Sequence, residues 1–355
     1  LFASFFVLFI CVIIGISVSS SHDIKEVTFS HYEGVKKFNY LDFIPFTEYS
    51  YASDGMIVDE NGYLYFGCFD GFIRRFNPNT DEVENVVDLG KVLSSKSVPL
   101  GIAFASRNGG EGLLITDPLH GILFFDMKTK KVEIITSKGD VNVPNDIIVS
   151  KTNPNIAYFT DSTRISISDD FDLVALLFED YLIANPSGRV FKLNIDSGKV
   201  EVLVSNLWFP TGICFGEDET TAIVSVTFSS SIIEIPIQST IREEYSYLAE
   251  NLPYYPGSLT GLESKFVVSS VLNRQPEWEN YIQPYKYVKG ILRYIPSIFL
   301  PKILSFSPFF QSFTYDGESG TLWIYPSSSH PFSSIVIYGS KLFFTFSASP
   351  VPLSF

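Results

Sequence analysis

Short runs of alternating hydrophobic and polar residues recur along the chain from residue 49 onward. Four of these runs begin with a glycine turn, and the first three are followed by a polar turn and a second alternating run. The four runs are Gly-Phe-Ile-Arg-Arg-Phe at 71–76, Gly-Ile-Leu-Phe-Phe at 121–125, Gly-Arg-Val-Phe-Lys-Leu at 188–193 and Gly-Thr-Leu-Trp-Ile-Tyr at 320–325. A period of two residues is typical of β-strands. Strand units that repeat in this way indicate a solenoid or a propeller.

Six further hydrophobic segments supply one central strand for each repeat. They begin near Tyr63, Leu113, Ile156, Ile223, Phe266 and Leu342. Six repeats fall in the range of closed propellers. The pattern therefore predicts an all-β fold, a six-bladed β-propeller that occupies residues 49–355.

Two stretches interrupt the strand pattern. Residues 165–186 contain an apolar run at 171–178 that predicts a short amphipathic helix, and residues 277–308 are rich in Tyr, Ile, Leu, Phe and Pro. Both are expected to be inserts that cover one face of the propeller. For residues 277–308 a membrane-facing apolar surface is the alternative, because large apolar patches usually contact something.

The N-terminal residues predict a membrane-targeting segment. Residues 1–18 carry no charge, and the first charged residue is Asp23. This length fits an uncleaved signal anchor, and the Ser-Val-Ser at 17–19 fits a cleaved signal peptide. We expect residues 1–20 to be the anchor or signal and residues 21–48 a stalk. The propeller is then lumenal or extracellular on a single-pass protein of the secretory pathway or cell surface, or secreted if the segment is cleaved.

The net charge narrows the binding partners, and the cysteines raise the question of a disulfide. The 355 residues carry a formal net charge of -14, which disfavours nucleic acid and anionic membrane surfaces as electrostatic partners. Cys11 lies in the apolar N-terminal run, and spacing does not decide whether Cys68 and Cys214 pair. Two buried strand thiols are the simpler interpretation.

Five short motifs resemble those of the strictosidine synthase-like family, and within it the adipocyte plasma membrane-associated protein branch. They are Pro-Leu-Gly-Ile at 99–102, Pro-Asn-Asp-Ile at 144–147, Tyr-Phe-Thr-Asp-Ser at 158–162, Gly-Arg-Val at 188–190 and Phe-Pro-Thr-Gly at 209–212. Their order and spacing extend the resemblance from about Asp54 to the C-terminus. The resemblance implies a six-bladed propeller, in agreement with the repeats, and an N-terminal membrane anchor.

A broader resemblance to calcium-dependent propeller hydrolases implies a metal site. In those proteins the starts of the inner strands offer oxygen ligands to one Ca²⁺ at the mouth of the central tunnel. The corresponding positions here are Asp54, Asn145, Thr211 and Ser258. Only one is a carboxylate, so calcium should bind weakly unless Asp146 or Asp161 also faces the tunnel. The alternative is that Asp54 and Asn145 cap strand ends.

The same resemblance sets the function hypotheses. Ser333 falls where strictosidine synthase has its catalytic glutamate, so strictosidine synthesis is not expected, and Asp54 and His330 are the remaining candidate catalytic residues. The first hypothesis is a membrane-associated hydrolase of small esters or lactones, with arylesterase-like activity. The second is a non-catalytic binding or scaffold propeller at a membrane.

Overall fold

A computed structural model of the chain describes residues 53–80, 82–239, 241–261, 265–293, 309–314, 319–324, 332–338 and 341–346. Only the backbone is described for residues 53 and 54 and for those after residue 308. The segment predicted to be an anchor, residues 1–20, and the stalk, residues 21–48, lie outside the described residues. Among the helices of the described part, none is long and apolar enough to cross a membrane.

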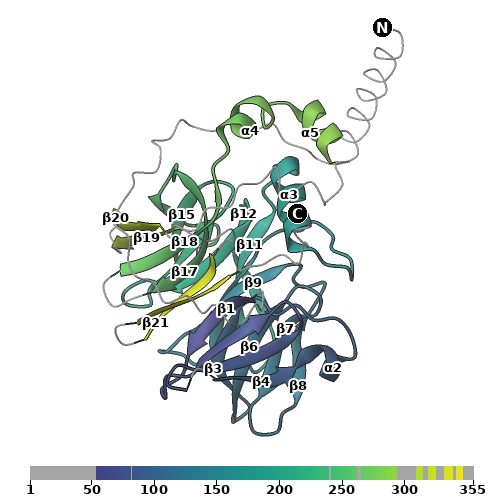
Figure 1. Cartoon of the computed structure of the whole chain (residues 1–355), viewed down its shortest axis with the longest axis vertical. Helices are drawn as coiled ribbons and strands as arrows, with labels where there is room; N and C mark the ends of the chain where they lie inside the picture. The colour runs from purple at the N-terminus through teal and green to yellow at the C-terminus, as the bar shows by residue number, and fades with distance from the viewer. Residues whose placement is uncertain are drawn as a thin grey trace.

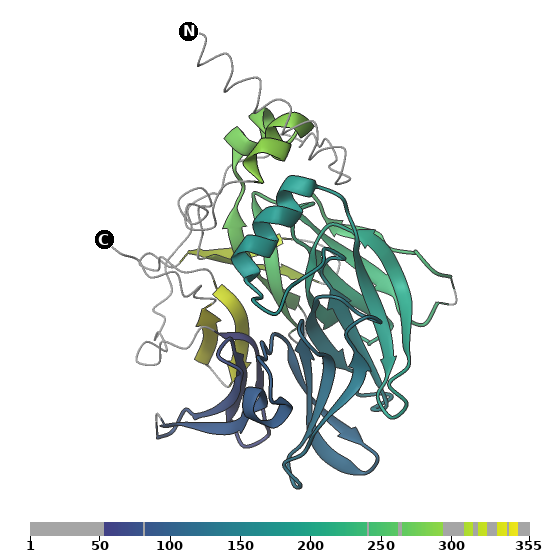
Figure 2. The same ribbon diagram turned by 90° about the vertical axis from the view of Figure 1, so that its right-hand side faces the viewer.

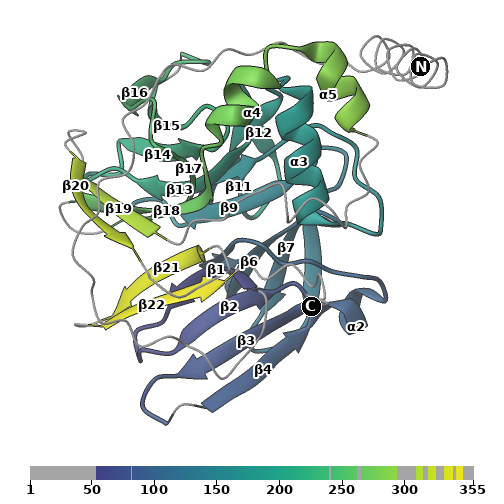
Figure 3. The same ribbon diagram turned by 45° about the horizontal axis from the view of Figure 1, so that its top comes forward.

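The described strands form antiparallel sheets that follow one another along the chain (Figures 1 and 3). The first sheet contains β1 (Ser53–Val58), β2 (Leu64–Cys68), β3 (Phe72–Asn77) and β4 (Glu82–Asp88). The second contains β5 (Ile102–Arg107), β6 (Gly110–Asp117), β7 (Gly121–Asp126) and β8 (Val132–Ser137). The third contains β9 (Pro144–Val149), β10 (Ile156–Asp161), β11 (Gly188–Asn194) and β12 (Val200–Leu207).

Two more four-stranded sheets and a pair of strands complete the described part. The fourth sheet contains β13 (Pro210–Phe215), β14 (Thr221–Val226), β15 (Ser231–Pro236) and β16 (Ser246–Ala249). The fifth contains β17 (Tyr254–Gly261), β18 (Lys265–Asn273), β19 (Phe309–Thr314) and β20 (Ser319–Ile324). The last sheet pairs β21 (Phe332–Tyr338) with β22 (Lys341–Phe346).

The fold is an all-β propeller, but the prediction of six blades is met only in part. Five sheets have four described strands each, and the sixth has two, so six complete blades are not described. Strand β21 contacts β1 on one side and β17 on the other, which places the pair between the first and the fifth sheet.

The strands that dominate the sequence pattern are the second strands of the blades. The segments predicted at Leu113, Ile156 and Ile223 are β6, β10 and β14, whose side chains are buried over most of their length. Both faces of these strands are covered because a blade packs on each side. The prediction of a fourth repeat at 320–325 was wrong in its position, since β20 is the outer strand of its sheet whereas the other three copies are third strands.

Glycine lets the inner strands of neighbouring blades approach each other closely. A Cβ atom on Gly101 would stand 2.5 Å from the carbonyl oxygen of Asn145, and one on Gly212 would stand 2.4 Å from the amide nitrogen of Leu259. Contacts this short exclude any side chain. The glycines of the Pro-Leu-Gly-Ile and Phe-Pro-Thr-Gly motifs are therefore required by the packing of blade on blade.

Helices occupy the two predicted inserts. Helix α3 (Leu173–Ile183) falls within the insert predicted at 165–186 and begins at the N-cap Asp172, whose carboxylate accepts hydrogen bonds from the Val174 and Ala175 amides. Helices α4 (Pro276–Tyr281) and α5 (Lys286–Leu292) lie in the region predicted as the second insert, with α4 beginning one residue earlier than expected. Figure 2 shows all three at one end of the molecule. The short helix α2 (Leu89–Leu93) joins the first two sheets.

The two described cysteines are free thiols. Cys68 lies on β2 and Cys214 on β13, and both are buried in different blades. Cys68 and Cys214 therefore do not form a disulfide with each other.

Candidate functional site

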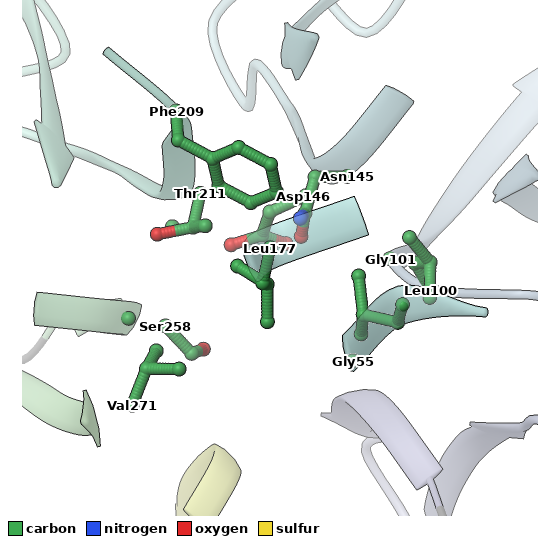
Figure 4. A pocket seen from close by; sticks show the side chains of 13 residues that line it. Gly55, Leu100, Gly101, Asn145, Asp146, Leu177, Phe209, Thr211, Ser258 and Val271 are labelled. Carbon is green, nitrogen blue, oxygen red and sulfur yellow. The ribbon is translucent and has the colours of Figure 1, made fainter. Parts of the chain in front are cut away.

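One pocket lies at the ends of the inner strands, and three of the four predicted metal-site residues line it (Figure 4). Asn145 comes from β9, Thr211 from β13 and Ser258 from β17. The space amounts to about 600 Å³, counting the part that is open to solvent. The remaining lining residues are Gly55, Leu100, Gly101, Asp146, Leu173, Leu177, Phe209, Gly212, Gly257 and Val271.

The other predicted site residues are not tested by the structure. Asp54 lies on β1 next to the pocket residue Gly55, but its side chain is outside the described part. Ser333 lies on β21, where only the backbone is described, and His330 lies outside the described residues. The roles of Asp54 and His330 therefore stay predictions.

Asn145 presents an amide to the pocket. Its side chain is 8% exposed, and its Nδ2 donates a hydrogen bond of 3.1 Å to the Ser162 hydroxyl. No described residue donates to its side-chain oxygen. A ligand in the pocket can therefore meet either an amide oxygen or the second amide hydrogen.

Thr211 uses its hydroxyl inside the wall of the pocket. Its Oγ1 lies 2.9 Å from the Ser225 hydroxyl and 3.0 Å from the Thr227 hydroxyl. Thr227 in turn donates to the Pro256 carbonyl at the start of the next inner strand. The hydroxyl thus connects two neighbouring blades, a structural role that the sequence alone did not indicate.

Asp146 has a clearly raised pKa and lines the pocket; it lay outside the four predicted ligands and was named only as a carboxylate that could also face the tunnel. When the starts of the inner strands are superposed by sequence, Asp146 takes the position of Gly55, Gly101 and Gly212. Its Oδ2 accepts a hydrogen bond of 3.0 Å from the Ile213 amide, which belongs to the next blade. Its Oδ1 accepts one of 2.9 Å from the amide of the following residue. The sequence signal that could have identified Asp146 is a carboxylate at a position where three other inner strands have glycine.

Burial raises the pKa of the Asp146 carboxyl to about 7, and the two amide donors oppose that rise only in part. Part of the side-chain surface faces the pocket, while protein surrounds the rest. The carboxyl therefore changes its protonation state near neutral pH. A group of this kind is suited to general acid–base chemistry.

Apolar side chains form the rest of the lining. Leu173 and Leu177 come from α3, so this helix covers the pocket, and Val271 comes from β18. Phe209 is 1% exposed and has a φ of 61°, an unfavourable backbone conformation for a bulky residue. Strain of this kind persists only where the surrounding structure enforces it, and it is common at functional sites.

Threonine and serine hydroxyls form the same hydrogen bonds between successive blades beneath the pocket. Thr160, on β10, accepts a hydrogen bond from the Asp146 amide and donates one to the Thr211 carbonyl of the next blade. Thr116 and Ser225 do the same in the preceding and following blades, toward the Asn145 and Gly257 carbonyls. These bonds fix the backbone from which the pocket residues project.

Asp161 does not face the pocket. Its Oδ1 accepts hydrogen bonds from the Asn142 and Val143 amides, and its Oδ2 pairs with the Arg189 guanidinium. Asp117 has the equivalent role in the second blade, where it accepts from the Val98 amide. These aspartates organise the loops at the blade ends.

His120 is part of a small polar cluster at the end of the second blade. Its Nε2 lies 2.8 Å from the Ser95 hydroxyl, and its Nδ1 lies 3.3 Å from Asp117 Oδ1. The Nδ1 atom forms no hydrogen bond with the described residues, and Ser95 is exposed outside the pocket. The cluster therefore holds the loop after α2 against the second blade.

The described donors do not fit a tight calcium site. Calcium takes six to eight oxygens and favours carboxylates. Here the Thr211 hydroxyl is engaged in the wall, Asp146 already accepts two amide hydrogens, and the pKa of its carboxyl is raised to about 7. Across the described residues there is no group of three or more His, Cys, Asp or Glu side chains that could hold a metal.

The fold and the pocket together define a class of protein: a β-propeller with a pocket where its inner strands begin. Sequence comparison then supports the resemblance inferred from the motifs, since the family described as strictosidine synthase matches residues 145–239. These residues run from the start of β9 to just beyond β15 and include Asn145, Asp146 and Thr211.

Curated relatives carry the same family descriptions. The chain is 28% identical over 220 residues to the adipocyte plasma membrane-associated protein hemomucin of Drosophila melanogaster, covering 58% of this chain and 36% of that protein. It is 26% identical over 201 residues to strictosidine synthase-like protein 4 of Arabidopsis thaliana, covering 56% and 50%. These alignments span between a third and a half of the relatives' lengths. The adipocyte plasma membrane-associated protein of Mus musculus is 22% identical over 311 residues, covering 80% and 72%.

Solved structures share the fold at low sequence identity. A gluconolactonase from Xanthomonas campestris gives a TM-score of 0.57 at 16% identity, covering 85% of each chain. The calcium-binding protein regucalcin from Agrobacterium tumefaciens gives 0.55 at 11% identity, covering 81% of this chain and 79% of that one. A chain of a nidogen/laminin complex gives 0.55 at 13% identity, covering 84% and 87%. The likeness establishes the propeller fold and leaves the chemistry open.

Proposed function

We propose that this chain is a membrane-associated, six-bladed propeller hydrolase of small esters or lactones, and that its pocket uses Asp146 as the general base. The observation that carries the proposal is the partly buried Asp146 carboxyl in the same pocket as Asn145 and Ser258, with its pKa raised to about 7. The lactonase among the structural neighbours and the membrane-associated proteins among the relatives support the proposal. The pair β21–β22 is then the inner part of the sixth blade.

The proposed chemistry follows from the atoms in the pocket. Each Asp146 oxygen accepts one amide hydrogen and keeps a further acceptor site, so the ionised carboxylate can take a proton from a water molecule. The water oxygen attacks the ester carbonyl carbon as that proton leaves. The leaving alkoxide then receives the proton, which regenerates the carboxylate. The free hydrogen of the Asn145 amide is positioned to stabilise the developing oxyanion.

The apolar lining sets the expected substrate class. Leu177, Phe209 and Val271 contact the substrate, and the described part of the pocket contains no arginine or lysine. An uncharged acyl group fits these surroundings better than an anion does.

The test is hydrolysis of a panel of aryl esters and lactones by the full chain and by its Asp146→Asn variant. We expect kcat/KM to rise with pH through about 7 in the unmodified chain, and to fall at least about 100-fold in the variant. Asp170→Asn is the matched control, because Asp170 is exposed and forms no hydrogen bond with the described residues. Full activity in Asp146→Asn would falsify the assignment of the base.

A non-catalytic binding propeller is the second candidate function. The observation that favours it is that the Thr211 hydroxyl is engaged by the Ser225 and Thr227 hydroxyls in the pocket wall. In the hydrolases that the chain resembles, this position is expected to hold a metal ligand. If no member of the panel is hydrolysed by the folded, unmodified chain, this candidate replaces the first.

A further inference from the structure

Large exposed side chains gather on helices α4 and α5. Tyr281 is 73% exposed, Tyr285 55%, Tyr287 49% and Val288 39%. We call these four residues the tyrosine surface. Figures 1 and 2 show α4 and α5 at the end of the molecule, beyond α3.

The opposite sides of the same helices are firmly attached to the propeller. Trp278 packs edge-on against Phe178 of α3, with ring centroids 5.8 Å apart. The Gln283 side chain donates a hydrogen bond of 2.6 Å to the Tyr181 carbonyl and accepts one of 3.1 Å from the buried Lys289 ammonium. The tyrosine surface is therefore presented by anchored helices.

A buried ion pair strengthens that attachment. The Arg274 guanidinium and the Glu279 carboxylate are 1% and 3% exposed and lie 2.7 Å apart. Glu279 also accepts a hydrogen bond of 2.6 Å from the Tyr255 hydroxyl of β17. Breaking such a pair by removing one partner is strongly unfavourable. The orientation of α4 is thus fixed by the propeller.

The tyrosine surface lacks the excess of negative charge that the whole chain carries. The chain has 39 acidic residues, but residues 280–315 contain none and include Lys286, Lys289, Arg293 and Lys302. Lys289 is buried and Arg293 pairs with Glu179. Lys286 stands among the tyrosines, with its ammonium 5.5 Å from the centre of the Tyr287 ring. Glu277 in the first turn of α4 is the exposed acidic residue nearest in the sequence to the tyrosine surface, whereas no acidic residue lies between Asn280 and Tyr315.

The sequence that follows α5 continues the same character. Residues 294–308 read Tyr-Ile-Pro-Ser-Ile-Phe-Leu-Pro-Lys-Ile-Leu-Ser-Phe-Ser-Pro, with one lysine as the sole charged residue. Tyrosine has an apolar ring and a polar hydroxyl, which is why it is enriched at the boundary between lipid and water. Basic residues beside aromatic and aliphatic ones are typical of segments that lie on a membrane surface.

We infer that the tyrosine surface docks on an anionic lipid bilayer, as a membrane contact separate from the N-terminal segment. The tyrosine rings enter the headgroup region, and Lys286 meets the lipid phosphates. Helix α5 contacts α3, and α3 contributes Leu173 and Leu177 to the pocket. Docking therefore brings the membrane close to the helix that covers the pocket. The contact does not depend on whether the pocket is catalytic.

The test places an environment-sensitive fluorophore on the full chain through Tyr287→Cys. Cys68 and Cys214 are buried, and the unmodified chain measures any label taken up elsewhere. Vesicles of phosphatidylcholine with about 30% phosphatidylserine should shift the emission to the blue, and pure phosphatidylcholine vesicles should do so less. Tyr247→Cys on β16 is the matched control, because Tyr247 is 50% exposed but lies outside α4 and α5, and its label should not shift.

A second variant tests the surface itself. Tyr281→Ser, Tyr285→Ser and Tyr287→Ser together should weaken binding to the anionic vesicles at least about tenfold, because much of the apolar ring area that enters the lipid is lost. Lys286→Glu should weaken it as well and reduce its dependence on phosphatidylserine. An unshifted label at position 287 with the vesicles bound would overturn the inference. So would a shift that depends on protein concentration and not on lipid, which would indicate a second copy of the chain.

Discussion

At the scale of single residues, position decides chemistry. Asp146 stands where three other inner strands have glycine, and the same place in the fold that excludes a side chain elsewhere gives this carboxyl a raised pKa of about 7. Burial raises the pKa of Asp161 as well, one strand away, but the oxygens of Asp161 are used by two amides and Arg189 and do not face the pocket. Residue type alone does not distinguish the two.

The titration of Asp146 predicts how stability depends on pH. Its pKa is about 7 in the folded chain and about 4 in the unfolded chain, so between these values the folded state holds the extra proton. Stability contributed by this group is therefore lost as pH rises from about 4 to 7. Asp180, buried on α3 with its pKa raised to about 7, acts in the same direction.

Urea unfolding at pH 4.5 and 7.5 measures this loss. Asp146→Asn should reduce the difference between the two unfolding free energies by about 1–3 kcal/mol, and Asp170→Asn should leave it unchanged. If the unfolding free energy changes equally between the two pH values in Asp146→Asn and in the unmodified chain, the pKa of the Asp146 carboxyl is not raised by folding.

At the scale of elements, the inner strands and the helix α3 make the pocket. Glycine lets neighbouring strands meet, and the hydroxyls of Thr116, Thr160 and Ser225 connect the second, third and fourth blades each to the following one. Helix α3 then covers the pocket with Leu173 and Leu177. The pocket is therefore a property of the contacts between blades.

Gly101→Ala tests that contact. Its Cβ would stand 2.5 Å from the Asn145 carbonyl oxygen and 2.8 Å from the Asp146 Cα, both backbone atoms that cannot turn aside. We expect a loss of at least about 2 kcal/mol of unfolding free energy, measured by urea denaturation. Gly90→Ala is the control, since a Cβ there meets nothing closer than 3.5 Å and the helix α2 should gain slightly. Equal stability of the two variants would contradict the proposed close packing.

At the scale of the whole molecule, the propeller supports either hydrolysis or binding. Its structural neighbours include a gluconolactonase, a calcium-binding protein and a chain of a nidogen/laminin complex. The pocket residues, not the fold, must decide between these functions.

Calcium removal tests the metal that the resemblance implies. Because the described donors offer so few free oxygens, we expect a dissociation constant at or above millimolar. Calcium at about 1 mM, compared with EDTA, should then raise the melting temperature of the full chain by less than about 2 °C. A shift of several degrees that disappears in Asp54→Asn would instead establish Asp54 as a calcium ligand.

Much of the architecture could be predicted from local sequence. Hydrophobic segments placed the second strands of several blades, alternation of period two placed third strands, and the apolar run at 171–178 predicted the helix that the structure shows as α3. The position of β20 was wrong because a glycine turn followed by alternation fits an outer strand as well as a third strand. The convergence of Asn145, Thr211 and Ser258 on one pocket followed from the resemblance. Asn145 and Thr211 occupy equivalent positions in their blades, whereas Ser258 stands one residue later, at the position of Asp146.

The sequence by itself determined the strands, the inserts and the glycines that allow the blades to meet, because these depend on short-range pattern and on backbone freedom. Only the tertiary structure decided which polar groups face the pocket, because that depends on neighbours distant in the chain. Thr211 is turned into the wall by Ser225 and Thr227, Asp146 is held by an amide of the next blade, and the tyrosines of α4 and α5 are left outside. Burial and the pKa of a carboxyl arise from the packing of blade on blade, which no single segment specifies.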